Sequence, residues 1–91
     1  MYIREILNKI KWDPSFIKKK HQYSIQYTHR GIIGDHVVIC YTQIKKVCSS
    51  SFEYWNEIIR ETVRIPFHRI EKIFNNETHE ILYKNRLSGA Q

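Results

Sequence analysis

A proline between two apolar runs, within residues 63–74, constrains the fold more than any other feature of the chain. Pro66 has no N–H and a fixed φ, so it can end a strand or enter a turn but cannot occupy a central ladder position. We therefore expect pairing to stop at Pro66, a tight turn through the next three residues, and a new strand from about Ile70. A turn between two anchored strands holds its polar side chains steadily at the surface, and here these are His68 and Arg69.

The same arrangement occurs once earlier, at residues 37–48, at a constant offset of 26. The apolar anchors repeat, but the turn residues do not: Thr42-Gln43 in the first copy correspond to His68-Arg69 in the second. We predict two strand–turn–strand units with Tyr41 and Phe67 in equivalent places; chance similarity between apolar strands is the alternative. The identical pairs are Val37 and Val63, Ile39 and Ile65, Ile44 and Ile70, and Lys46 and Lys72.

The N-terminal segment has the periodicity of an amphipathic helix. The residue before Pro14 is disfavoured in the α region, so this helix should end by about Trp12, which we expect to pack against the sheet. The apolar stripe, spaced i, i+3, i+4 and i+7, consists of Ile3, Ile6, Leu7 and Ile10.

Residues 23–30 alternate between apolar and polar side chains and predict a half-buried strand, with Tyr27 and His29 on its apolar face. Residues 49–61 suit either a helix or a hairpin that turns near Asn56, and we favour the hairpin. A last strand is expected at about residues 80–83.

The chain has 15 Lys and Arg residues against 9 acidic residues, a formal net charge of +6. This balance favours an anionic partner such as nucleic acid, although a basic protein without such a partner is the alternative. No apolar run approaches ~18 residues, so neither a membrane-spanning helix nor a membrane partner is expected. The run Lys18, Lys19 and Lys20 is a candidate for phosphate contacts that act through charge, or else a solvated loop.

Metal and cofactor binding are not expected. The five histidines show no ligand spacing, the two cysteines form no Cys-x-x-Cys motif, and three scattered glycines make no phosphate-binding loop. Cys40 and Cys48 suit free thiols in a reducing compartment, so a cytoplasmic location is predicted.

Three segments carry a resemblance to a known family. Ile65-Pro66-Phe67-His68-Arg69-Ile70 resembles the Ile-Pro-Tyr-His-Arg-Ile signature of the RNA cyclic group end recognition domain, a mainly archaeal family that also occurs fused to other domains in eukaryotes. Residues 3–13 and the Tyr-Thr-His-Arg-Gly of residues 27–31 match further parts, in the family's order. The family usually has Val-Trp where this chain has Leu82-Tyr83, so no aromatic contact is carried over there. The resemblance implies binding of RNA ends with a cyclic phosphate, without implying a reaction.

Two His-Arg pairs, His29-Arg30 and His68-Arg69, are the candidate ligand-binding residues. Arg presents a planar fork that can grip two phosphate oxygens, and His can donate a hydrogen bond and add charge when protonated. A 2′,3′-cyclic phosphate is compact and singly charged, so one or two residues of each type suit it. Neighbours on a strand point to opposite faces, so one member of each pair can be structural instead. The candidate stacking residues, with the core as their alternative place, are Tyr27, Tyr41, Trp55 and Phe67.

We expect one domain over residues 1–91 with an α+β fold. A helix at residues 1–12 should pack on a strongly bent antiparallel sheet of five or six strands within residues 23–84. This sheet could close into a small barrel, and residues 87–91 should form a frayed tail.

The expected partner is RNA, at a 3′ end with a phosphate or 2′,3′-cyclic phosphate, and the expected function is recognition of that end in RNA processing or repair. One alternative is an enzyme, such as a cyclic phosphodiesterase, with His29 and His68 as general acid and base. The other is a general basic interaction domain. Binding without catalysis is favoured, and the sequence indicates neither an RNA sequence preference nor an oligomeric state.

Overall fold

The computed structural model describes residues 3–28 and 36–85. The chain opens with helix α1 (Ile3–Trp12) and the short helix α2 (Pro14–Ile17), where Asp13 caps α2 by accepting a hydrogen bond from the Ser15 backbone. A 3₁₀ turn, η1 (Lys20–Gln22), leads into the strands. Lys18 and Lys19 therefore lie in the short connection between α2 and η1, and Lys20 begins η1.

Seven strands follow within the described residues, joined in part by two further 3₁₀ turns. The strands are β1 (Tyr23–Thr28), β2 (His36–Cys40), β3 (Ile44–Val47), β4 (Ser51–Asn56), β5 (Glu61–Pro66), β6 (Ile70–Asn75) and β7 (Ile81–Lys84). The turns are η3 (Tyr41–Gln43) and η4 (Phe67–Arg69). No helix in these described stretches is long and apolar enough to cross a membrane.

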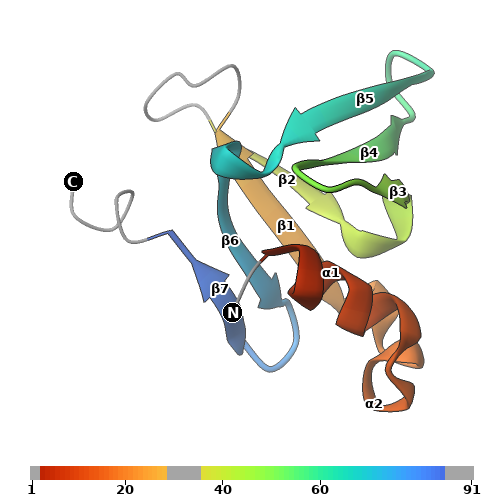
Figure 1. The fold of residues 1–91 in the computed structure, drawn as a ribbon. Helices are drawn as coiled ribbons and strands as arrows, with labels where there is room; N and C mark the ends of the chain where they lie inside the picture. Colours follow the sequence, from red (N-terminus) through yellow and green to blue (C-terminus); the bar gives the residue numbers. More distant parts are fainter. Residues whose placement is uncertain (1–2, 29–35, 86–91) are drawn as a thin grey trace.

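The strands form two antiparallel sheets, ordered β2-β1-β6-β7 and β3-β4-β5 (Figure 1). The expected α+β fold with one bent sheet of five or six strands is therefore wrong: the molecule is mostly β, with one short helix packed on it. The described strands do not close into a barrel. The physical reason lies in the two turns, because η3 carries the chain from β2 in one sheet to β3 in the other, and η4 carries it back from β5 to β6.

These two crossings have matching backbones. The residue before the turn, Cys40 or Pro66, is extended with ψ of 143° or 144°, and the residue after it, Ile44 or Ile70, has φ of −69° or −70°. In each turn the N–H of the following isoleucine donates to the carbonyl of the turn's first residue. The prediction of two equivalent strand–turn–strand units is confirmed.

The core lies between the two sheets and is closed on one side by α1, which contacts β3 of one sheet and β7 of the other (Figure 1). The predicted helix stripe is buried as expected, with Leu7 and Ile10 fully enclosed and Ile3 partly so. Trp12 is 68% exposed, contrary to expectation, because it follows Ile10 by only two positions and so falls off the stripe. Phe16 packs against the core instead, with its ring centroid 5.4 Å from that of Tyr23.

The uncertain region at residues 49–61 is a β-hairpin, as favoured. β4 and β5 pair from Ser51↔Pro66 to Asn56↔Glu61, and the Asn56 side chain accepts hydrogen bonds from the backbone of Ile58 and Ile59 in the turn. The positive φ of Arg60, 57°, completes the reversal.

Candidate functional site

Arg69, the last residue of η4, lines a cavity of about 450 Å³ between the two sheets. The side chain is half-buried, and the cavity draws its wall from β1, β2, β4 and β5 as well as from η4. The other lining residues are Tyr27, Val37, Tyr54, Asn56, Ile59, Val63, Arg64 and Ile65.

A pair of tyrosines forms the polar part of this wall. The hydroxyl groups of Tyr27 and Tyr54 share a hydrogen bond of 2.6 Å across the two sheets. Burial, and then the bond to Tyr54, raise the pKa of Tyr27, while the nearby positive charge of Arg69 opposes that rise. Arg69 and the two tyrosines line the same cavity, and the positive charge of Arg69 favours the ionised form of Tyr27.

The two arginines of the cavity differ in their partners. Arg64 donates two hydrogen bonds to one carboxylate oxygen of Glu53, at 2.7 and 3.3 Å, and this partner raises the pKa of Arg64. The ion pairs found among residues 3–28 and 36–85 do not include Arg69. A half-buried guanidinium without a carboxylate partner is suited to an anionic ligand.

Comparison with the first turn explains why Arg69 is available. In η3 the equivalent residue, Gln43, is held in place: it accepts a hydrogen bond of 3.0 Å from the Cys40 backbone and donates one of 3.2 Å to the Trp55 carbonyl. The residue equivalent to Cys40 is Pro66, which has no N–H to be satisfied. The proline therefore removes the capping role from the third residue of η4 and leaves its side chain free to enter the cavity.

The other two residues of η4 lie elsewhere. His68 is exposed and is not among the residues that line the Arg69 cavity. Phe67 is half-buried and lines a second cavity of about 410 Å³ together with Arg4 and Ser49. Phe67 and Arg69 of this turn thus line two different cavities, and His68 between them is exposed.

The remaining predicted residues divide into three groups. His29 and Arg30 lie outside the described residues, directly after the end of β1. Tyr27 and Tyr41 are buried in the core, at 2% and 5% exposure, so neither ring offers a face for stacking. Lys18 and Lys19 are exposed, whereas Lys20 lines a separate cavity at η3.

Two residues of the Arg69 cavity were not singled out from sequence. Tyr54 becomes relevant only because the second sheet brings it opposite Tyr27, a contact 27 residues apart in the chain that no local pattern reveals. Arg64 is marked only by its position two residues before Pro66. Within the described residues, no group of three or more His, Cys, Asp or Glu residues is placed to hold a metal ion.

The fold and this site define a small, basic, mostly β domain with a cationic turn beside a cavity. The chain belongs to the family described as the MJ1316 RNA cyclic group end recognition domain, whose family model matches residues 1–86. The family inferred from the three sequence segments is thus confirmed.

Archaeal relatives match over nearly the whole chain. A UPF0248 protein of Methanococcus maripaludis strain C7, MmarC7_1289, is 37% identical over 84 residues, covering 92% of this chain and 99% of the relative. The UPF0248 protein MJ1316 of Methanocaldococcus jannaschii is 33% identical over 84 residues, which cover 92% of this chain and 94% of the relative. No solved structure matches the chain.

Proposed function

We propose that this domain binds the 3′ end of RNA that carries a phosphate, above all a 2′,3′-cyclic phosphate, and that Arg69 contacts the terminal phosphate in the cavity beside η4. The observation that carries the proposal is Arg69, which is half-buried, lines a cavity, and forms no ion pair with any described residue. It lies within the segment that resembles the signature of a family described as the RNA cyclic group end recognition domain.

The dimensions and charge of the cavity support this ligand. A volume of about 450 Å³ lies within the range of small-ligand sites, which is ~300–1,000 Å³. The lining residues that the structure describes include two arginines and no carboxylate, and Arg64 is already engaged by Glu53. One available guanidinium matches the single negative charge of a cyclic phosphate.

The aromatic edge of η4 supports a contact with the terminal base. Phe67 takes the place of tyrosine in the family signature; it is half-buried and lines a cavity together with Arg4 and Glu5. A base that stacks on this ring would leave its phosphate near the other side of the same turn. His68, and His29 with Arg30 from the sequence-based proposal, would add hydrogen bonds or charge around it.

The test is competition binding among otherwise identical oligoribonucleotides that end in hydroxyl, 3′-phosphate or 2′,3′-cyclic phosphate, at one fixed salt concentration. Wild type should prefer the cyclic end. Arg69→Gln should remove that preference at a cost of roughly 1.5–3 kcal/mol, as for a hydrogen bond to a charged group. Arg69→Lys keeps the charge but loses the fork, so it should also discriminate poorly.

Arg60→Gln is the matched control, because it removes the same charge from the exposed β4–β5 turn outside the cavity lining. It should keep the wild-type preference. Equal wild-type affinity for all three ends, or an Arg69→Gln variant that discriminates like wild type, would contradict the proposal. Conversion of the cyclic end by wild type but not by His68→Ala would replace it with the enzyme interpretation.

A further inference from the structure

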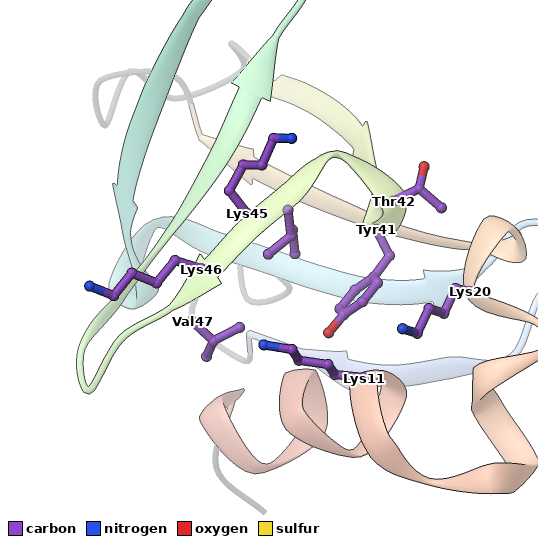
Figure 2. Close-up of a pocket in the computed structure, with 8 residues that line it drawn as sticks. Lys11, Lys20, Tyr41, Thr42, Lys45, Lys46 and Val47 are labelled. Carbon is purple, nitrogen blue, oxygen red and sulfur yellow. The ribbon is translucent and has the colours of Figure 1, made fainter.

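A second basic cavity lies at the first turn, away from Arg69. It has a volume of about 230 Å³ and is bordered by α1, η1, η3 and β3 (Figure 2). Four lysines line it, with Tyr41 and Thr42, and none of its described lining residues is acidic. The lysines, which come from three separate elements, are Lys11, Lys20, Lys45 and Lys46.

Lys11 and Lys20 lie on either side of Tyr41. Figure 2 shows the Lys20 side chain pointing toward the Tyr41 hydroxyl and the Lys11 side chain running beneath it toward Val47, while Lys45 and Lys46 extend away from the ring. Lys46 also faces Glu53 across the β3–β4 ladder. The ion pairs found in the described stretches involve neither Lys11 nor Lys20, and the ammonium group of Lys11 lies 5.1 Å from the ring centroid of Trp12.

This cavity is suited to bind an anion through positive charge and not through directional hydrogen bonds. The Tyr41 hydroxyl donates to the Leu7 carbonyl at 2.6 Å, and the Thr42 hydroxyl donates to the Cys40 sulfur at 3.2 Å, so neither proton is free for a ligand. Two lysine ammonium groups remain, and lysine binds phosphate as a point charge without the geometric demands of arginine. Such a site suits an internal phosphodiester, which has no distinctive end to read.

We propose that Lys11 and Lys20 bind a backbone phosphate of an RNA strand, at a site separate from the one that holds its end. The partner class rests on the proposed function, whereas the site does not use Arg69. The two cavities are close, because Tyr54 of the first and Ile44 of the second are paired in the β3–β4 ladder. Val37 of β2 and Tyr41, the first residue of η3, likewise line one cavity each; they are four residues apart, which is at most about 13 Å of extended chain. A strand of a few nucleotides covers that distance.

The structure supplies a matched control within the same lysine run. Lys18 and Lys19 are exposed and do not line the cavity, while Lys20 does. Each of two double variants therefore removes two positive charges, from neighbouring parts of the molecule: Lys11→Gln/Lys20→Gln inside the cavity and Lys18→Gln/Lys19→Gln outside it. If net charge alone mattered, both double variants would weaken RNA binding equally.

The experiment measures the affinity of each double variant for an oligoribonucleotide of about ten nucleotides across a salt series. Lys11→Gln/Lys20→Gln should lower the affinity several-fold and reduce the slope of log K against log salt by ~0.7, the value for one neutralised phosphate on a single strand. Lys18→Gln/Lys19→Gln should change both much less. Lys11→Arg/Lys20→Arg keeps both charges and should bind RNA like wild type. That result would show that the affinity lost in Lys11→Gln/Lys20→Gln comes from the missing charge and not from substitution at these two positions.

A nucleoside 2′,3′-cyclic phosphate separates this site from the end site, because it has no internal phosphodiester. Its affinity should be unchanged in Lys11→Gln/Lys20→Gln and reduced in Arg69→Gln. Equal losses of oligonucleotide affinity in the two glutamine double variants, or no loss in either, would overturn the lysine site. Loss of end preference with an intact lysine effect would overturn the end site alone.

Discussion

The two 3₁₀ turns have the same backbone and different surroundings. In η3, Tyr41 is buried with its hydroxyl bonded to the Leu7 carbonyl, and Gln43 caps the strand before it. In η4, Phe67 is only half-buried, His68 is exposed, and Arg69 enters a cavity instead of capping. The same crossing between sheets is thus held by hydrogen bonds to neighbouring elements in the first copy, whereas in the second its side chains are exposed or line cavities.

One residue accounts for much of the difference. Cys40 has an N–H that needs an acceptor at this partly buried position, and Pro66 has none. The proline also fixes the φ that the turn requires, so the second copy keeps its shape without a side-chain cap. A repeated unit can in this way release one position for ligand binding while the fold is preserved.

The largest expected effect concerns the helix that braces the first turn. Leu7 is fully buried and its carbonyl accepts the Tyr41 hydroxyl, so Leu7→Ala should lower the free energy of unfolding by ~2–5 kcal/mol. Trp12→Ala, at an exposed position of the same helix, should change it by no more than ~0.5 kcal/mol. Thermal or denaturant melts measure both, and equal effects would contradict the packing of α1.

The third position of each turn gives the next test. Gln43→Ala removes the acceptor for the Cys40 N–H and the donor to the Trp55 carbonyl, so it should cost about 1–2 kcal/mol of stability. Within the described residues Arg69 makes no capping hydrogen bond in η4, so Arg69→Ala should leave the free energy of unfolding within ~0.5 kcal/mol of wild type. If Arg69→Ala were the more destabilising of the two in denaturant melts, Arg69 would be a structural residue and not a free one.

The first position of each turn can be exchanged between the copies. Tyr41→Phe loses the hydrogen bond to Leu7 and should cost about 1 kcal/mol. Phe67→Tyr adds a hydroxyl at the edge of an open cavity and should be nearly neutral. A neutral Tyr41→Phe in the same melts would show that the hydroxyl does not brace η3 against α1.

A smaller effect follows from pH. Burial raises the pKa of Tyr41 to about 12, above the 10.0 that is usual for tyrosine, so the fold favours the neutral phenol. Above about pH 10 the unfolded chain ionises this group while the folded chain does not, and stability should fall as the pH rises toward 12. Tyr27 acts in the same direction. Melts across this range should show a shallower decline for Tyr41→Phe than for wild type, and an identical decline would contradict the burial of this hydroxyl.

The sequence predicted local structure better than the arrangement of layers. Periodicity located α1, Pro66 located the second turn, and the offset of 26 revealed the first, because each depends on nearby residues. No local sequence pattern indicates that the strands on either side of a turn belong to different sheets. For this reason one bent sheet was expected, whereas the structure has two. The cavity linings could be predicted only in part for the same reason: the turn marked Arg69, whereas Tyr54 and Lys11 reach their cavities only through tertiary packing.

The central claim is that the second turn, and not the first, receives the RNA end. Amide chemical shifts measured by NMR during titration with a nucleoside 2′,3′-cyclic phosphate test it directly, since both turns report in one experiment. We predict saturable shifts at Phe67–Ile70 and in Tyr27 of β1, with the amides of Tyr41–Ile44 little changed. Equal shifts at both turns, or shifts confined to the first, would contradict the account.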